Sequence, residues 1–380
     1  MIVELHILQS FAPSNLNRDD TGAPKDCDFG GVRRARISSQ SLKRAMRRAF
    51  AAGDLVPPGL RATRTKRVIS QIAASLVADG RTSEDARVLA TAVLAAGGIK
   101  STDGEVGALM FVGQDEIDAL AELALAHADG LLVATPPEGG PEKPRGRKSG
   151  TGLPDLKVAV TAALIRSRSV DVALFGRMIA ELPAGNVDAS AQVAHAISTH
   201  RVELDFDYYT AMDDLATPEE TGAAMVDTVE FNAATYYRYA TVDLSSLYAQ
   251  LDDTDRLRLA LDAFLRAAIV AEPSGKQNSF AAHNPPSYVF LVVRDAGTWS
   301  LANAFLRPVR ASGERDLVDR SIEELEAYWA RLGRMYGARG LRFAGSAADR
   351  ELPTHDGIHR ADGVDALVGQ VVAIAAGGAA

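Results

Sequence analysis

The alternation of apolar and polar residues at the start of the chain predicts a β-strand. Val3, Leu5 and Ile7 alternate with Glu4 and His6, which is the period of two of a strand. From Ser38 to near Gly53 the period becomes helical, with a buried stripe made of Leu42, Ala45, Met46, Ala49 and Phe50. The opposite side of this helix carries Gln40, Lys43, Arg44, Arg47 and Arg48.

The N-terminus of this helix is suited to an anion. Ser38 or Ser39 is a good N-cap. Free backbone N–H groups and the positive end of the helix dipole then lie beside the cations. Charge runs are usually solvated helix faces, but here hardly any acidic residues are interleaved.

The next part of the chain is helical. Ala- and Leu-rich segments near 61–78, 84–96 and 114–129 predict helices. Residues 136–150 are a low-complexity stretch rich in Pro, Gly and Lys. We expect this helical insertion to end near Pro183.

Strand patterns return after the insertion. Residues 194–210 alternate as an extended arm would, and a second such stretch covers 225–231. Strands at 235–239 and 287–293 accompany helices near 254–271 and 319–336, with a polar loop at 273–280. Strand and helix elements at both ends predict an α+β sheet domain interrupted by a helical insertion.

The charge distribution sharpens the anion-site hypothesis. The 380-residue chain has a net charge of −8, yet residues 1–67 hold 13 Lys+Arg and 6 Asp+Glu. The rest of the chain carries a net charge of −15. We therefore expect a localised anion-binding site near the N-terminus, and we expect the acidic remainder of the chain to face other molecules.

Several classes of site are disfavoured by the composition. The single cysteine, Cys27, excludes an intramolecular disulfide and a cysteine-rich zinc site. The longest apolar runs are too short to span a bilayer. We expect a soluble, cytoplasmic protein that does not bind a membrane.

No catalytic motif is recognised. The pairs His195/His200 and His355/His359 lack a third convergent ligand. Adjacent acids such as Asp213 and Asp214 point to opposite sides of an extended segment. Gly275-Lys276 is followed by glutamine, without the upstream glycine of a phosphate-binding loop. We predict a protein that is not an enzyme and has no cofactor or metal.

Specific strings resemble a known family. They are Leu16-Asn17-Arg18-Asp19-Asp20, Lys25-Asp26, Phe29-Gly30-Gly31 and the run from Arg36 through Ser38-Ser39-Gln40 to Arg47, with Ala173–Met178 and Ser274–Ser279 downstream. These strings resemble the CasC proteins, the Cas-seven family backbone subunits of the type I-E CRISPR Cascade complex. Order and length agree across essentially the whole chain outside the 136–150 stretch.

The resemblance implies a hand-shaped fold and a role. The palm would be a modified RRM or ferredoxin-like sheet formed by 1–58 and 226–380, with helical fingers at 59–185 and an extended thumb β-hairpin at 186–225. Copies would stack head to tail along CRISPR RNA, grip its phosphates and present its bases to target DNA. The implied partners are CRISPR RNA, target DNA through the guide, other copies of the chain and other Cascade subunits.

The resemblance also implies RNA-contacting residues. Arg18 and Lys25 match the family's RNA-contacting loop, and its phosphate-facing helix matches Ser38, Gln40, Lys43, Arg44 and Arg47. The other candidates are Arg34 and Arg36 on one side of a strand, Phe175 and Met178 in the fingers, Ile197, Thr199 and His200 on the thumb, and Lys276, Gln277 and Asn278 in a polar loop. Each of these groups also has an ordinary structural interpretation.

Two other functions stay open. A type III-like RNA-guided ribonuclease backbone would cut target RNA with a loop aspartate, and Asp19, Asp20, Asp26 and Asp28 lie in the matching region. A monomeric RRM-like protein that binds single-stranded RNA would share the cationic helix but would not oligomerise along RNA.

Overall fold

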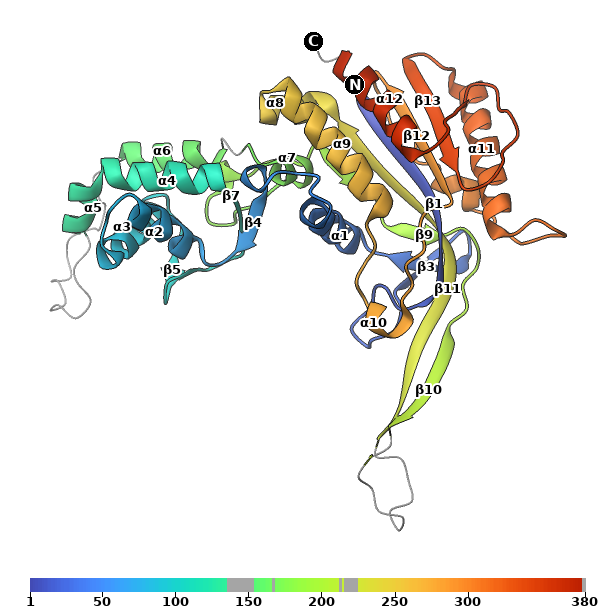
Figure 1. The fold of residues 1–380 in the computed structure, drawn as a ribbon, viewed down its shortest axis with the longest axis horizontal. Coiled ribbons are helices and arrows are strands. Elements are labelled where there is room, and N and C mark those ends of the chain that lie inside the picture. The colour runs from blue at the N-terminus through green and yellow to red at the C-terminus, as the bar shows by residue number, and fades with distance from the viewer. Residues whose placement is uncertain (135–153, 166–167, 212–213, 215–224, 378–380) are drawn as a thin grey trace. The chain divides into compact units, whose positions relative to one another are not determined.

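The described residues form two compact units, and each unit is held together by contacts among its own residues (Figure 1). Our computed structural model describes residues 1–134, 154–165, 168–211, 214 and 225–377, so the 136–150 stretch lies outside the described residues. The sheet unit comprises 1–55, 191–244 and 261–380, and the helical unit comprises 56–190 and 245–260. The predicted α+β class is confirmed.

The sheet unit is built on one large sheet. Its main strand order is β14-β13-β12-β1-β11-β9-β3-β2, with β8 and β10 also paired to β11. All these pairs are antiparallel except β13 with β14. The strands are β1 (Ile2–Ser14), β2 (Asp26–Phe29), β3 (Val32–Ile37), β8 (Ala191–Val193), β9 (Ala196–Ser198), β10 (Asp205–Ala211), β11 (Met225–Asp243), β12 (Tyr288–Arg294), β13 (Leu341–Ala348) and β14 (His359–Arg360).

Strand β1 is covered on both faces. Val3, Leu5 and Ile7 are buried as predicted, but Glu4 and His6 on the other face are also fully buried. Tyr237 contacts the His6 ring, with 2.9 Å between its hydroxyl oxygen and Nδ1. Burial lowers the pKa of His6 to about 3. The alternation predicted the strand, but the polar positions are satisfied inside the protein and not by water.

Helices cover the two faces of this sheet. On the Leu5 face lie α1 (Ser39–Ala52), α9 (Thr254–Val270) and α12 (Val364–Gly377), while α11 (Leu317–Tyr336) lies on the other (Figure 1). Leu42, Met46 and Phe50 are the buried side of α1, as the helical period predicts. The α11 face is an aromatic core that includes Tyr237, Phe290 and Trp329. Short helices α10 (Gln277–Phe280) and η3 (Ala302–Phe305) complete the unit.

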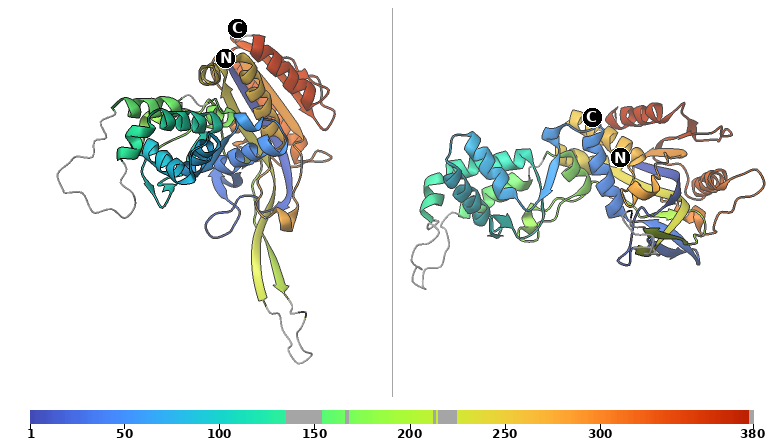
Figure 2. Two further views of the ribbon diagram at one scale, coloured as in Figure 1. Left: turned by 60° about the vertical axis from the view of Figure 1, so that its left-hand side comes forward. Right: turned by 60° about the horizontal axis from the view of Figure 1, so that its bottom comes forward.

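A long hairpin extends from the sheet. Strand β10 pairs only with the first residues of β11, from Asp205 opposite Phe231 to Ala211 opposite Met225 (Figures 1 and 2). Every β10 side chain is exposed. The range 194–210, expected to be one extended arm, instead holds two strands, because β9 pairs within the main sheet and β10 pairs with the start of β11. We call β10 and the paired residues 225–231 the thumb hairpin.

Arg34 joins the base of the thumb hairpin to the rest of the sheet unit. Its side chain is fully buried on β3. It donates to the carbonyl oxygens of Phe29 at 3.1 Å, Ser198 at 3.2 Å, Thr199 at 2.7 Å and Phe305 at 2.6 Å. Burial lowers the pKa of this guanidinium. The nearby two-residue turn needs glycine, since Gly30 and Gly31 have φ of 64° and 78°.

The helical unit packs around an aliphatic core of its own. Its helices are α2 (Val68–Ala78), α3 (Ser83–Ala96), α4 (Gln114–Ala126), α5 (Ala128–Ala134), α6 (Pro154–Ile165), α7 (Val170–Phe175), η1 (Pro58–Leu60) and η2 (Pro183–Gly185), and α8 (Leu244–Leu251) falls mainly in this unit. Short strands β4 (Ala62–Thr65) and β7 (Met110–Gly113) pair, as do β5 (Ser101–Thr102) and β6 (Glu105–Val106). The predicted insertion at 59–185 falls within this unit, which also includes 245–260.

Arg177 holds the helical unit together at its centre. Its guanidinium lies 2.6 Å from the Glu116 carboxylate and donates to the carbonyl oxygens of Phe111 and Gly185, both at 3.0 Å. It also donates to the carbonyl of Leu164. Both charged side chains are almost completely buried. One arginine therefore fixes four separate segments of the unit.

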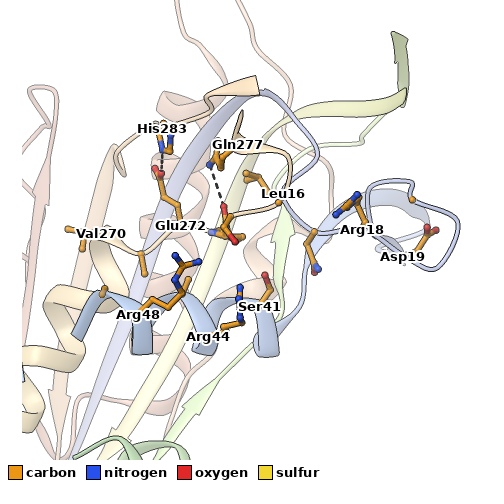
Figure 3. Close-up of a pocket in the computed structure, with 18 of the residues that line it drawn as sticks. Leu16, Arg18, Asp19, Ser41, Arg44, Arg48, Val270, Glu272, Gln277 and His283 are labelled. Carbon is orange, nitrogen blue, oxygen red and sulfur yellow. Dashed lines mark hydrogen bonds and ion pairs between the residues drawn. The ribbon is translucent and has the colours of Figure 1, made fainter. Parts of the chain in front are cut away.

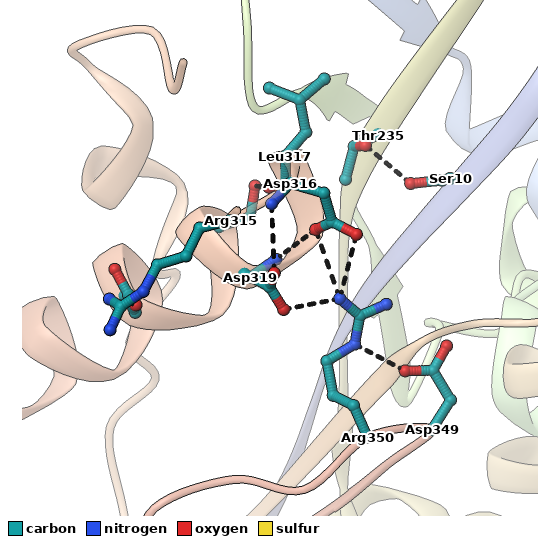
Figure 4. Close-up of polar contacts among 10 residues, drawn as sticks. Ser10, Thr235, Arg315, Asp316, Leu317, Asp319, Asp349 and Arg350 are labelled. Atoms are coloured by element: carbon teal, nitrogen blue, oxygen red, sulfur yellow. Dashed lines mark hydrogen bonds and ion pairs between the residues drawn. The ribbon is translucent and has the colours of Figure 1, made fainter. Parts of the chain in front are cut away.

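A second ionic cluster fixes the start of α11 (Figure 4). Asp316 is the N-cap and accepts from the backbone N–H of Asp319 at 2.8 Å. Arg350, after the end of β13, donates to Asp319 at 2.6 Å, to Asp349 at 2.8 Å and to Asp316 at 3.2 Å. The Arg350 hydrogen bond lowers the pKa of Asp319.

Within the described residues, no helix has the length and apolar content needed to cross a membrane.

Replacing Arg177 by methionine is expected to destabilise the helical unit by about 3–5 kcal/mol, because it leaves the Glu116 carboxylate buried without its partner. Hydrogen exchange of the amides in α4 would report this loss. The double variant R177M/E116Q should recover part of it, and the amides of β12 in the sheet unit serve as the internal control. Unchanged exchange in α4 of R177M would contradict this assignment.

Replacing Arg350 by glutamine is expected to weaken the acid dependence of stability. Asp319 has a lowered pKa in the folded state. Its contribution is therefore complete above the unfolded-state pKa of about 3.9 and is lost as the pH falls through the folded value. The melting temperature measured between pH 6 and pH 2 (roughly the range of carboxylate titration) should fall less steeply for R350Q. An identical slope for the two proteins would be the contrary result.

Candidate nucleic-acid interface

The start of α1 is fixed by the loop that follows β1. Ser38 is the N-cap, and its Oγ accepts from the backbone N–H of Ser41 at 3.4 Å. Asn17 accepts from the backbone N–H of Ser38 at 2.8 Å, and its own carbonyl accepts from the backbone N–H of Lys25 at 2.8 Å. The two family-like strings around Asn17 and Ser38 are thus in direct contact.

Asp19 organises the tip of this loop. One of its carboxylate oxygens accepts from the Thr21 hydroxyl at 2.8 Å, the Thr21 N–H at 2.9 Å and the Ala23 N–H at 3.0 Å. The hydrogen bond from the Thr21 hydroxyl is the main cause of its lowered pKa. This carboxylate is therefore occupied in shaping its own turn.

The segment 270–283 packs against the same loop. A Cβ atom on Gly275 would lie 2.3 Å from the carbonyl oxygen of Leu16, so only glycine permits this approach. Gln277 stabilises the turn by donating to the carbonyl oxygen of Ala282 at 3.1 Å. Proximity of this segment to α1 is a tertiary effect that the sequence pattern does not predict.

These three segments enclose a cleft of about 900 Å³ (Figure 3). One wall is α1, with Ser41, Arg44 and Arg48 facing the cleft. The loop from Leu16 to Gly22 and the segment 270–275, with Gln277 and His283, form the others. All of these residues belong to the sheet unit.

Two arginines of the cleft are available to an anion. Arg44 and Arg48 are exposed in it, and no hydrogen bond or ion pair of either side chain is found among the described residues. Of the three acidic residues that line the cleft, Asp19 is engaged in its own turn, Glu272 lies 2.9 Å from His283, and Asp20 is exposed. Because no described residue pairs with Arg44 or Arg48, both can interact with a ligand.

The remaining polar residues of α1 lie on its other flank. Lys43 and Arg47 are half-buried beside the apolar stripe, and Gln40 is exposed. Burial lowers the pKa of Lys43. The cationic side of the helix therefore consists of two rows, Lys43 with Arg47 and Arg44 with Arg48, and the second row lines the cleft. Arg18 is exposed at the cleft, and Lys25 is half-buried outside it.

Two strand arginines differ from each other in accessibility. Arg34 is enclosed by the four carbonyl groups described above, so it has no surface to offer to a ligand. Arg36 is half-buried, donates to the carbonyl oxygen of Asp26 at 3.0 Å and lies 3.1 Å from His195. The expectation that Arg34 faces RNA does not agree with this burial.

Thr199 and His200 lie at the base of the thumb hairpin and not along it. Thr199 is fully buried, and the Ser321 hydroxyl donates to its Oγ1 at 2.9 Å. The His200 Nε2 accepts from the backbone N–H of Thr235 at 3.2 Å, and its Nδ1 lies 2.7 Å from the carbonyl oxygen of Arg201. Burial lowers the pKa of His200, which favours the neutral ring that these contacts need.

The other candidates occupy separate places. Gln277 lines the cleft, whereas Lys276, with a φ of 51°, and exposed Asn278 do not. In the helical unit, Phe175 ends α7 half-buried, while Met178 is 78% exposed. Met178 is therefore the accessible member of that pair.

Sequence reasoning left out some of the residues that line the cleft. Arg48 lies one turn after Arg44 and was recognised on the polar side of the helix, but it was not among the candidate ligands. The sequence pattern does not indicate that Glu272 and His283 line the cleft, because only the tertiary fold brings them near α1. Within the described parts of the chain, no group of three or more His, Cys, Asp or Glu side chains is placed to hold a metal ion.

Comparison with known proteins identifies the family. The family model described as CT1975-like protein, a Cas family, matches residues 3–369. A chain of a structure described as "CRISPR RNA-guided surveillance complex, pre-nicking" is 34% identical, with a TM-score of 0.83 over 99% of this chain and 100% of that one. A chain of another "CRISPR RNA-guided surveillance complex" is 29% identical, with a TM-score of 0.73 over 98% and 99%. A search of curated proteins found no match. With a family model that spans nearly its whole length, the chain belongs to the Cas family of CT1975-like proteins.

Proposed function

We propose that the chain is a non-catalytic backbone subunit of a type I-E Cascade surveillance complex, equivalent to CasC. Copies bind head to tail along CRISPR RNA, hold its phosphates and leave its bases available to target DNA. The similarity to chains of RNA-guided surveillance complexes supports this role. The RRM-like description of the palm and the contacts with other Cascade subunits are part of the same proposal.

The observation that carries the proposal is the cationic side of α1. Ser38 is buried as the N-cap, Gln40 is exposed and Ser41 lines the cleft, and two rows of cations follow, one of them open to the cleft. A phosphate strand along this helix meets hydroxyl, amide and guanidinium donors in turn, all of which bind phosphate regardless of the base. A protein that binds a guide RNA needs no preference for its sequence, because base pairing between guide and target supplies the specificity.

The thumb hairpin has two chemically different faces. Strand alternation places Phe206 and Tyr208 on one face, where Glu230 lies opposite Phe206. Asp205, Asp207 and Tyr209 share the other face, where Asp227 lies opposite Tyr209. Phe206 is 65% exposed and Tyr208 is 66% exposed. Aromatic rings stack on unpaired bases, whereas carboxylates repel phosphates. The face of Phe206 and Tyr208, which carries fewer carboxylates, is thus the one suited to RNA.

The ribonuclease alternative receives less support. Of the four aspartates that could serve it, Asp19 uses one carboxylate oxygen to accept three hydrogen bonds inside its own loop, and Asp26 is paired with Arg33. A role in binding RNA gives the same loop a function, because the loop places Arg18 at the cleft. We therefore propose that the loop supports binding and that the protein is not an enzyme.

Removing either row of cations on α1 is expected to weaken RNA binding about tenfold at physiological salt, equally for all guide sequences. The variants are R44A/R48A and K43A/R47A. Each should reduce the slope of log affinity against log salt by roughly 1.4, the value for two single-strand phosphates. Filter binding over a salt series measures both quantities, and R64A/R81A, which alters exposed arginines of the helical unit, is the control.

The phosphate assignment would be contradicted if both variants kept the wild-type slope, or if the loss depended on RNA sequence.

Shortening the thumb hairpin is expected to spare folding but to impair assembly along RNA. Tyr208 and Thr228 are directly paired, so an Asn-Gly turn can replace residues 209–227. Circular dichroism should be preserved because the removed side chains of β10 are exposed. Light scattering on long RNA should show smaller particles than those of the wild type. Particles of wild-type size would show that the thumb hairpin does not link copies.

A further inference from the structure

A second cavity, of about 610 Å³, lies in the sheet unit at the ends of β12 and α11. Trp299 and Trp329 line it, with ring centroids 5.6 Å apart. Arg294 lines it as well, together with Arg334, Arg339, His355 and Asp356. Its volume lies within the range of specific ligand sites. None of these residues contributes to the cleft beside α1.

Arg294 is held in this cavity without full satisfaction of its donors. Its side chain is 5% exposed, with the guanidinium carbon 4.1 Å from the Trp299 ring centroid and 5.5 Å from that of Trp329. Its Nε lies 3.0 Å from the Glu4 carboxylate as an ion pair, but neither Nε nor Nη2 makes a hydrogen bond with the described residues. Buried donors are normally paired, so these two call for an explanation.

The rim of the cavity is cationic and continues into an apolar surface. Arg334 and Arg339 are exposed, and no ion pair of either is found in the described parts of the chain. Beside them, Met335 is 73% exposed and Tyr336 is 62% exposed, with the Tyr336 ring 5.9 Å from that of Trp299. Trp, Tyr, Met and Arg are the residue types enriched at protein–protein interfaces.

We propose that this cavity, the Arg–Trp pocket, binds an acidic segment of a partner protein that packs a large apolar side chain against the tryptophan-lined wall of the cavity. The carboxylates of such a segment would pair with Arg334 and Arg339 at the rim. Charge complementarity supports this occupant, because a net positive pocket stands out on a body whose residues 68–380 carry −15. The exposed Met335 and Tyr336 favour a protein over a nucleotide, since they add apolar contact area outside the pocket.

The test uses the intrinsic fluorescence of the full-length chain, which has only two tryptophans, Trp299 and Trp329. Both lie in the Arg–Trp pocket, so tryptophan emission reports on this site alone. The probe is an acetylated and amidated peptide, EDLFED. The comparison ligands are EDGSED, which lacks the apolar pair, KKLFKK, which reverses the charge, and adenosine monophosphate.

We expect EDLFED to shift the emission saturably and the two altered peptides to bind at least about tenfold more weakly. The charge-reversal variant R334E/R339E should weaken EDLFED by about tenfold or more. R64E/R81E, with two exposed arginines of the helical unit reversed, should bind as the wild type does. Both variants alter exposed residues, so folding is expected to be preserved.

Three results would overturn the proposal. They are no emission change with EDLFED up to about 1 mM, equal binding of R334E/R339E and the wild type, and tighter binding of the nucleotide than of the peptide.

Discussion

The sheet unit depends on one buried cation. Arg34 has no acidic partner among its described hydrogen bonds, and carbonyl groups from β2, the end of β9 and η3 share its charge. A buried guanidinium is tolerated only when such groups replace its hydration. The same contacts tie together the turn between β2 and β3, the base of the thumb hairpin and η3 at Phe305. Arg34 thereby supports the base of the thumb hairpin from inside the protein and has no exposed surface of its own.

Glycines make this arrangement possible at two points of close approach. A Cβ on Gly30 would lie 2.0 Å from the carbonyl oxygen of Leu306, and Gly275 approaches Leu16 in a similar way. Both positions fall in strings that resemble the Cas-seven family. Gly275 lets two backbone segments meet at the cationic cleft, and Gly30 lets the turn between β2 and β3 approach Leu306. These two parts of the family-like strings therefore have a packing role.

Local patterns predicted the elements well, and tertiary contacts account for most of the differences. The stripe of Leu42, Met46 and Phe50 faces the core as expected, since a helical period needs no knowledge of the partner. Strand alternation could not tell that Glu4 and His6 face a second covered layer. Nor could it tell that Arg34 points inward and that the residues near Thr199 pair within the sheet. Membership of 245–260 in the helical unit likewise has no local signal.

The central claim is that copies of this chain add along RNA and do not act singly. Native mass spectrometry of the chain with RNAs of increasing length tests it most directly. The account predicts that the number of bound copies rises in regular steps with RNA length, whatever the RNA sequence. A single bound copy at every length would contradict it and would indicate a monomeric single-strand binder.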